Sequence, residues 1–371
     1  GLTPALLDAA ADRVAACHAA LPPLPGVRSD MAWVARSNAD AALAAGLDPA
    51  RIGAWRASML ERLDALADWR DARAREGFVR RCHGDLHLGN MCLRGGVPIP
   101  FDALEFDEAL ATTDTGYDLA FLLMDLDVRA GRAAANRAMN RYLARTGDWG
   151  MLAGMAPFLS SRALIRAHVA SRPGTEAAAE DYLRRAEAYL APAPGVVVAI
   201  GGLPGTGKST LARALAPGLG AAPGAAIARS DEIRKRLAGL APEERLPPDA
   251  YTPQAGRAVF ARLAEEIALA ARAGQSAIAD AMFAAPEQRA AVEAAARGAD
   301  VPFVGIWLEA PLAELERRVA ARRGDASDAG VEVLRAAARN DAGPGGWTPV
   351  DAASSDAAAA LAMALIRPHI H

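Results

Sequence analysis

One short segment constrains the fold of this sequence more than any other. Residues 202–209 read Gly-Leu-Pro-Gly-Thr-Gly-Lys-Ser, which fits the pattern G-x-x-x-x-G-K-[ST]. An apolar run at residues 196–200 comes directly before it, and an amphipathic stretch at residues 210–215 comes directly after it. A strand, a glycine-rich turn and a helix in that order are the context in which this pattern forms a phosphate-binding loop. The segment therefore predicts an α/β domain that binds a nucleoside triphosphate.

The fixed positions of this loop have chemical reasons. Glycines let backbone N–H groups curl around phosphate oxygens, and the N-terminus of the following helix adds positive potential. Lys208 is placed to reach the β- and γ-phosphates of ATP, and Ser209 to ligate Mg²⁺. A chance match is expected on the order of once in a hundred such sequences, so an incidental glycine-rich turn is the weaker alternative. The predicted ATP-binding residues are Gly202, Leu203, Pro204, Gly205, Thr206, Gly207, Lys208, Ser209 and Thr210.

The length of the chain, 371 residues, exceeds what one ordinary hydrophobic core holds, so we expect two domains. Residues 191–195 read Ala-Pro-Ala-Pro-Gly and predict a linker, because prolines at alternate positions cannot continue a helix. Residues 1–190 are predicted to be mostly helical, with a short strand and a hairpin after residue 78. Residues 196–371 alternate apolar strands with helices, which indicates a parallel sheet covered on both faces.

The composition excludes several classes of protein. The net charge is −3 and no basic run occurs, so binding of a long nucleic-acid backbone is not expected. The three cysteines are too few for a disulfide framework and lack metal-ligand spacing, which favours a reducing compartment. No apolar stretch approaches the length of a membrane span. We therefore predict a cytoplasmic protein with no membrane contact.

Three further segments of the second domain carry a family resemblance. Residues 229–235 read Arg-Ser-Asp-Glu-Ile-Arg-Lys, residues 278–283 read Ile-Ala-Asp-Ala-Met-Phe, and residues 317–329 are rich in arginine. Over about 196–350 the sequence resembles the small P-loop kinases that include gluconate kinases, chloramphenicol phosphotransferases, polynucleotide kinases and zeta-type toxins. This resemblance implies that Asp231 is the base for the acceptor hydroxyl and that Asp280 lies near Mg²⁺. It also implies that two arginines close over the phosphates as a lid, and these are Arg318 and Arg322.

The positions of the two acids support these roles independently. Asp231 and Asp280 each follow an apolar strand, which places them at the carboxyl ends of parallel strands, where open α/β sheets bind ligands. The alternative for Asp231 is a helix N-cap, which is compatible with catalysis. The alternative for the arginines is a solvated helix face.

A second motif lies in the first domain. Residues 83–90 read His-Gly-Asp-Leu-His-Leu-Gly-Asn and carry H-x-D-L-x-x-x-N, the catalytic-loop pattern of protein-kinase-like enzymes. With Gly84, a following Asp102 and the acids near residue 117, this domain resembles the C-terminal lobe of the aminoglycoside phosphotransferase family. The resemblance implies that Asp85 is a base for the acceptor hydroxyl and that Asn90 and Asp102 are Mg²⁺ ligands.

This motif has two other interpretations. His83, Asp85 and His87 are residue types that bind metals, but a metal site made of them explains neither Asn90 nor Asp102. A purely structural polar loop is the weakest interpretation.

The first domain departs from its family in one respect. Residues 1–190 contain no lysine and no glycine-rich loop, whereas the family has an N-terminal β-rich lobe with a phosphate-binding lysine. Either that lobe has been lost or the chain is a fragment of a longer protein. The helical opening and the start at Gly1 favour the fragment, so we expect the lobe in the full-length chain. The whole arrangement resembles the bacterial bifunctional aminoglycoside phosphotransferase/ATP-binding proteins.

The predicted function is transfer of the γ-phosphate from ATP, with Mg²⁺, to a hydroxyl of a small polar molecule. One alternative is a regulatory or toxin-like module that binds ATP with little turnover. Another is a 5′-hydroxyl nucleic-acid kinase, which the acidic balance disfavours. Acceptor specificity is expected in the weakly patterned segments at residues 241–254 and 343–350.

Overall fold

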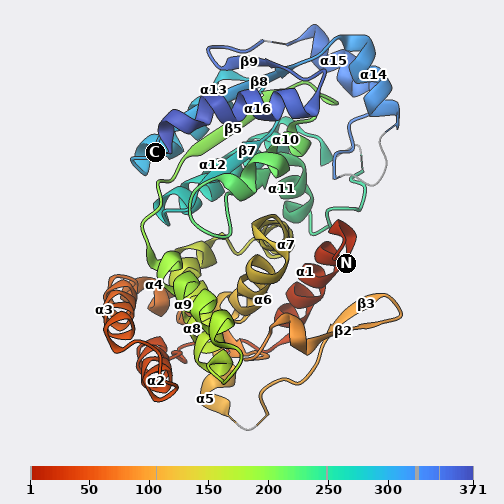
Figure 1. Ribbon diagram of the computed structural model, residues 1–371. Helices are drawn as coiled ribbons and strands as arrows, with labels where there is room; N and C mark the ends of the chain where they lie inside the picture. Colours follow the sequence, from red (N-terminus) through yellow and green to blue (C-terminus); the bar gives the residue numbers. More distant parts are fainter. Residues whose placement is uncertain (1, 106, 248–249, 322–325, 342, 371) are drawn as a thin grey trace. The chain divides into compact units, whose positions relative to one another are not determined.

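The computed structural model describes residues 2–105, 107–247, 250–321, 326–341 and 343–370 (Figure 1). The chain divides into two compact units. The first comprises Gly1–Tyr142 and Met151–Pro192, and the second comprises Leu143–Gly150 and Ala193–His371. The domain limits 1–190 and 196–371 stay a prediction. Within the described ranges, no helix has both the length and the apolar character needed to cross a membrane.

The first unit is mostly helical, with two small antiparallel sheets, β1 with β4 and β2 with β3. Its elements are α1 (Pro4–Ala20), α2 (Met31–Ala44), α3 (Pro49–Ala65), α4 (Ala67–Arg75), β1 (Val79–Arg81), η1 (Leu88–Asn90), β2 (Met91–Arg94), β3 (Val97–Pro100), α5 (Glu108–Ala111), β4 (Thr112–Asp114), α6 (Thr115–Ala130), α7 (Arg132–Thr146), η2 (Trp149–Gly154), α8 (Met155–Ala170) and α9 (Glu176–Leu190). The predicted hairpin is therefore present. The end of α7 and the start of η2 lie in Leu143–Gly150, which belongs to the second unit.

Helix α6 forms the centre of the first unit. Every residue from Thr115 to Asp127 is buried, and the helix packs against α8, which packs in turn against α9. A helix that is apolar on all sides has to be enclosed by others, and this explains its central place. The buried stretch nevertheless includes the acids Asp118 and Asp125, whose partners are described with the site below.

The second unit alternates strands and helices. Its elements are β5 (Val197–Gly202), α10 (Lys208–Leu215), η3 (Ala216–Gly218), β6 (Ala226–Arg229), α11 (Ser230–Leu237), α12 (Pro253–Arg272), β7 (Ala277–Asp280), α13 (Pro286–Gly298), β8 (Phe303–Glu309), α14 (Leu312–Ala321), α15 (Val331–Arg339), β9 (Thr348–Asp351), α16 (Ser355–Ile366) and η5 (Arg367–His369). Thr252 caps α12 by accepting a hydrogen bond from the Ala255 N–H at 3.1 Å, and Pro253 follows at the first helical turn.

The strands of this unit form one five-stranded sheet in the order β6-β7-β5-β8-β9, and all its pairs are parallel. Helices α10 and α16 pack on each other and on one face, while α12 and α13 pack on each other and against β6, β7 and β8 (Figure 1). The side chains of Val198, Ile200, Leu211 and Ile366 belong to the core beneath α10 and α16. The predicted fold class, a parallel sheet flanked by helices after a mostly helical region, is confirmed.

Strand β9 was not predicted. Its sequence, Thr-Pro-Val-Asp, contains a proline, which lacks the N–H that a central strand must donate. The strand lies at the edge of the sheet and pairs only with β8, where Pro349 stands opposite Trp307. The closing helix, α16, begins at Ser355, after this strand.

Trp347 anchors the segment that leads into β9, and we expect its removal to destabilise the second unit. Its ring contacts Phe283 at a centroid distance of 4.9 Å, and its Nε1–H donates to Glu293 at 2.9 Å. A Cβ added at Gly305 would lie 2.4 Å from the indole, which shows how closely the ring packs. Trp347→Ala should lower the free energy of unfolding by about 3–5 kcal/mol, because a large buried side chain leaves a cavity.

Chemical denaturation followed by circular dichroism measures this effect. Trp33→Ala is the matched control, because Trp33 is 46% exposed and its loss should change stability by no more than about 0.5 kcal/mol. Equal effects of the two substitutions would contradict the packing described for Trp347.

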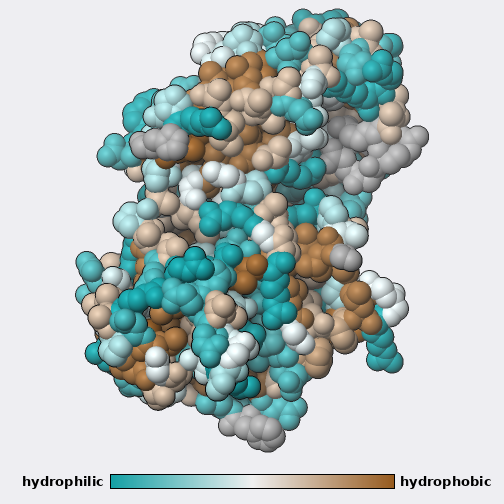
Figure 2. Space-filling model, in the orientation of Figure 1, coloured by the Kyte–Doolittle hydropathy of each residue, from teal (hydrophilic) through white to brown (hydrophobic). Residues whose placement is uncertain are grey.

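Exposed large hydrophobic side chains include Leu93 and Val97 on the β2–β3 hairpin and Phe101 just after it. Figure 2 shows hydrophobic residues around this hairpin interspersed with hydrophilic ones. Single apolar side chains of this kind are ordinary on globular surfaces, and we assign no binding role to them.

Candidate active sites

The phosphate loop joins β5 to α10, as predicted. Gly205 and Gly207 have φ angles of 87° and 90°, which residues with side chains rarely adopt. A Cβ at Gly205 would also lie 3.0 Å from the carbonyl oxygen of Leu315 and from a methyl group of Val319. Helix α14 therefore lies directly against the loop, and the glycine is required by both conformation and space.

Polar contacts hold the loop in its curved shape. The Lys208 amine donates to the carbonyl oxygens of Gly202 and Leu203, both at 2.9 Å. The Thr206 hydroxyl donates to the Leu203 carbonyl at 2.8 Å. The cation is thus held over the loop, at the N-terminus of α10, where a bound triphosphate would need positive charge.

Two predicted Mg²⁺-site residues are brought together beside the loop. The Ser209 hydroxyl donates to the Asp280 carboxylate at 2.5 Å, although 71 residues separate them in the sequence. Asp280 ends β7, the neighbour of β5, and is only 4% exposed. Hydroxyl and carboxylate oxygens are the ligands that Mg²⁺ prefers, so the donor set fits this ion.

Sequence reasoning assigned no role to Arg229 or Glu232, which complete this cluster. Arg229 Nε lies 3.2 Å from the Asp280 carboxylate, and its Nη1 lies 3.1 Å from Glu232. Burial raises the pKa of Glu232, and the positive charge of Arg229 partly opposes that shift. The sequence did contain a signal for this pair, because Glu232 follows Arg229 by three residues and residues with that spacing are neighbours on a helix.

Asp231 lies in the first turn of α11, at the carboxyl end of β6. Burial raises its pKa, while the charge of Arg229 and a hydrogen bond with Ser327 act in the opposite direction. The charges of Asp280 and Lys208 also act on this carboxyl. The predicted base, the predicted metal-side acid and the phosphate-loop lysine therefore belong to one electrostatic cluster.

The two predicted lid arginines are not both visible beside the phosphate loop. Arg318 lies on α14, where it pairs with Glu314 at 2.7 Å and donates to the Ala352 carbonyl at 3.0 Å. These contacts direct its guanidinium toward the segment after β9, and its lid role stays a prediction. Arg322 lies outside the described residues.

A cavity of about 640 Å³ borders the phosphate loop on the side of β8 and β9. It lies at the carboxyl ends of these strands and has the size of an ordinary small-molecule site. Among its lining residues are Leu203, Thr206, Glu309, Leu315, Pro349 and Asp351.

The motif of the first unit brings two of its three predicted residues together. The Asn90 side-chain amide donates to the Asp85 carboxylate at 2.9 Å and to the Asp85 carbonyl at 3.0 Å. A hydrogen bond from His87 lowers the pKa of Asp85, although burial opposes this. Asp102 follows β3 with a φ angle of 61°, is exposed, and makes no hydrogen bond to any residue that the structure describes.

Each histidine of this motif has at least one ring nitrogen in contact with the protein, and Nδ1 of His83 is buried without a hydrogen bond to any described residue. Nε2 of His83 lies 2.9 Å from the Phe101 carbonyl, and Nδ1 of His87 accepts a hydrogen bond from the Gly89 N–H at 3.0 Å. Within the described ranges, the ligand atoms that lie close enough together to hold a metal ion belong to His18, Cys82 and Asp118, and the alternative site of His83, Asp85 and His87 finds no support.

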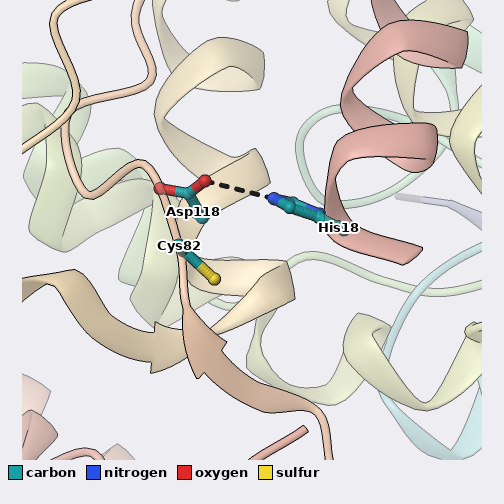
Figure 3. A group of neighbouring side chains, drawn as sticks. All are labelled: His18, Cys82 and Asp118. Atoms are coloured by element: carbon teal, nitrogen blue, oxygen red, sulfur yellow. Dashed lines mark hydrogen bonds and ion pairs between the residues drawn. The ribbon is translucent and has the colours of Figure 1, made fainter. Parts of the chain in front are cut away.

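Figure 3 shows a buried cluster of His18, Cys82 and Asp118. Its carboxylate contacts the backbone of Gly84, next to Asp85. Asp118 accepts hydrogen bonds from the backbone N–H of Gly84 at 2.8 Å and from Nε2 of His18 at 3.1 Å. Burial opposes ionisation of Asp118, but the hydrogen bond and charge of His18, the charge of Arg162 and the bond from Gly84 hold its pKa below the ordinary value. Burial also raises the pKa of the Cys82 thiol, which donates to the Thr113 carbonyl at 3.5 Å.

These three side chains have the residue types of a metal site, yet their polar atoms already have protein partners. Nδ1 of His18 lies 2.9 Å from the Tyr142 hydroxyl, so both ring nitrogens are engaged. The cluster holds the backbone of the loop that carries Asp85, because Asp118 accepts from two of its N–H groups. Arg162 assists by donating to the Gly84 carbonyl at 3.0 Å, and Asp125 accepts from the Leu88 N–H at 2.9 Å. Sequence reasoning missed His18 and Arg162, because no local pattern marks them.

Comparisons with known proteins agree with both motifs. Residues 197–342 match the family model described as an AAA domain, and residues 2–158 match that of the phosphotransferase enzyme family. Uncharacterised proteins of Mycobacterium bovis (strain ATCC BAA-935 / AF2122/97) and Mycobacterium tuberculosis (strain ATCC 25618 / H37Rv) are 30% identical over 280 residues. These residues are 73% of this chain and 55% of each relative, so the chain spans about half the length of the curated relatives it matches.

Among solved structures, a gluconokinase from Sinorhizobium meliloti 1021 is 21% identical, with 48% of this chain and 95% of that chain covered at a TM-score of 0.34. A putative kinase from Chloroflexus aurantiacus j-10-fl is 22% identical, with 48% and 98% covered at a TM-score of 0.36.

The family matches fall on the two motifs in the expected order. The phosphotransferase match includes the loop of Asp85 and Asn90, and the AAA match includes the phosphate loop with Asp231 and Asp280. The predicted union of a phosphotransferase domain with a P-loop ATP-binding domain is thereby confirmed. Residues 2–158 are thus similar to the phosphotransferase enzyme family and residues 197–342 to the AAA domain, and each match covers less than half of the chain.

Proposed function

We propose that the second unit transfers the γ-phosphate of ATP to a hydroxyl group of a small polar molecule. The observation that carries this proposal is the contact of Ser209 with Asp280 beside the phosphate loop, with Asp231 two residues after Arg229, which stands opposite Asp280 in the sheet. These groups lie at the carboxyl ends of three neighbouring strands, β6, β7 and β5. A loop that holds phosphates and an acid that accepts a proton are the two parts that phosphoryl transfer requires.

The residues of the site have distinct roles in this reaction. Lys208 and the loop amides bind the β- and γ-phosphates, and Ser209 and Asp280 hold Mg²⁺, which supplies neutralising charge when bound. Asp231 orients the acceptor hydroxyl and takes its proton as the oxygen bonds to the γ-phosphorus. The bond from that phosphorus to the β–γ bridging oxygen breaks, and ADP leaves. Arg318 and Arg322 are proposed to close over the phosphates.

The test is ADP release by the whole chain with MgATP and a panel of hydroxylated small molecules. Acceptor-dependent ADP release together with a phosphorylated product is the expected result. Tight ATP binding without acceptor-dependent release would instead support a regulatory or toxin-like module. Phosphorylation of a 5′-hydroxyl oligonucleotide, and of no small molecule, would support a nucleic-acid kinase.

For the first unit we propose the acceptor side of a second phosphotransfer site, with Asp85 as the base and Asn90 and Asp102 as Mg²⁺ ligands. Residues 1–190 contain no lysine to hold ATP phosphates, and the curated relatives are longer than this chain. We propose that the nucleotide-binding lobe of this site belongs to the longer protein.

This proposal predicts the ATP-binding stoichiometry of the 371-residue chain. Calorimetric titration should give one ATP per chain, and Lys208→Ala should remove that site. A second ATP bound with comparable affinity, and retained in Lys208→Ala, would show that residues 1–190 bind the nucleotide themselves.

A further inference from the structure

Arg229 bridges two acidic side chains at the carboxyl end of the parallel sheet. It is the last residue of β6 and stands opposite Asp280, the last residue of β7. Its Nε lies 3.2 Å from Oδ2 of Asp280, and its Nη1 lies 3.1 Å from Oε1 of Glu232. Because the guanidinium uses a different nitrogen for each carboxylate, one contact can break while the other persists.

The oxygen of Asp280 that faces Arg229 has a second partner. The Ser209 hydroxyl donates to the same atom, Oδ2, at 2.5 Å. Ser209 and Asp280 are the proposed ligands of Mg²⁺, and a carboxylate oxygen is a ligand that this ion prefers. The positive charge of Arg229 therefore lies against a ligand atom of the proposed metal site.

Burial makes the balance of these charges important. Arg229 is 6% exposed and Asp280 is 4% exposed, and a buried charge is costly unless it is paired. A divalent cation held by Asp280 would supply the charge that this carboxylate now receives from Arg229, and the two cations would repel each other. Glu232 provides a carboxylate that can keep the guanidinium paired when that repulsion acts.

We infer that Arg229 and Mg²⁺ compete for Asp280, and that Glu232 keeps the guanidinium when the ion binds. This inference rests on the proposed function, because the metal site is part of it. No covalent bond changes in the exchange. Arg229 and Glu232 are positioning residues, since they act on the reaction through Asp280, and together they set the concentration of Mg²⁺ that the site requires.

Metal binding is measured directly, with Mn²⁺ as the probe, because this ion takes the same oxygen ligands. The whole chain is saturated with an ATP analogue that has NH in place of the β–γ bridging oxygen, and electron paramagnetic resonance reports the unbound Mn²⁺. Arg229→Met should tighten Mn²⁺ binding, because it removes the competitor. Glu232→Gln should weaken it, because the guanidinium then stays on Asp280. Each shift should be about 10- to 100-fold, the size usual for residues that contact metal ligands.

The double variant distinguishes this exchange from the effect of charge alone. Two charges that act on the ion independently would also shift its affinity in opposite directions, but their effects would add. If Glu232 acts through Arg229, Glu232→Gln should have little effect once residue 229 is methionine. The double variant should therefore bind Mn²⁺ as tightly as Arg229→Met does.

Three further variants serve as controls. Arg213→Met removes an exposed arginine on α10 whose charge also acts on Glu232, and Arg297→Ala removes an exposed arginine on α13. Both should change Mn²⁺ affinity little, because salt screens exposed charges. Arg229→Lys keeps the charge but lacks the guanidinium fork, so the effect of Glu232→Gln should shrink in its background as well. It replaces Arg229→Met in the comparison if circular dichroism shows that Arg229→Met does not fold.

Two results would overturn the inference and leave the proposed function intact. In the first, the effects of Arg229→Met and Glu232→Gln add in the double variant. In the second, Arg229→Met binds Mn²⁺ no more tightly than the wild type, which would mean that the arginine only neutralises buried acids. If Asp280→Asn binds Mn²⁺ as tightly as the wild type, the metal site of the proposed function fails and this inference fails with it.

Discussion

Replacing Lys208 with alanine is expected to lower ATP-dependent turnover by on the order of 10²–10³-fold or more, because the amine is the positive side chain held over the phosphate loop. The loss should appear in both ATP affinity and kcat, since the β- and γ-phosphates are held in the ground state and gain charge in the transition state. Steady-state kinetics and calorimetric ATP titration measure the two effects.

The control for this substitution is structural. Lys208 is only partly buried and its hydrogen bonds go to loop carbonyls, so the thermal unfolding midpoint of Lys208→Ala should stay near that of the wild type. Arg297→Ala serves as the matched loss of a surface cation. Turnover by Lys208→Ala at the wild-type rate would remove the phosphate loop from the mechanism.

Replacing Asp231 with asparagine is expected to cost about 10²–10⁴-fold in kcat while ATP binding persists, because the amide cannot accept the proton of the acceptor. Unlike Lys208→Ala, this substitution should leave ATP affinity unchanged, because the two residues lie in different parts of the site. Lys208 is part of the phosphate loop, whereas Asp231 lies on α11 at the carboxyl end of β6. Rapid-quench measurement of product with ATP at saturation reports the chemical step directly.

The pH dependence gives a second readout for Asp231. A base acts only when deprotonated, so activity should fall as the pH falls through its pKa in the folded protein. Burial raises that pKa above the ordinary aspartate value of about 3.9, and the acid limb should therefore lie above this value. The residual activity of Asp231→Asn should lack the limb. If the limb persists in Asp231→Asn, another group is the base.

The phosphate loop was predictable because its information is local. Strand, glycines, lysine and helix follow one another within about twenty residues, and each position has its own physical reason. The contact between Ser209 and Asp280 could also be predicted, because both residues lie at the carboxyl ends of strands that a parallel sheet places side by side. The same argument predicted that Asp231 lies at the carboxyl end of a neighbouring strand.

What the sequence did not disclose depends on long-range contacts. Nothing near Asp328 indicates that it holds Tyr251, which lies 77 residues away. His18 lies 100 residues from Asp118, and its contact depends on how α1 packs against α6. Arg318 was assigned from a resemblance, while its observed partners are Glu314 and a backbone carbonyl that no side-chain pattern records.

The strand order gives the proposed ATP site and the proposed acceptor site different positions in the sheet. Strand β5, which carries the phosphate loop, has a neighbour on each side, whereas β6, which leads to Asp231, is an edge strand. Partial openings of a sheet begin at its edges, where fewer contacts have to break. Because β6 pairs with β7 alone, changes around Asp231 are expected to disturb the phosphate loop less than changes on the strands beside β5 would. Descendants of such a scaffold can change what they phosphorylate while they keep the same phosphate donor.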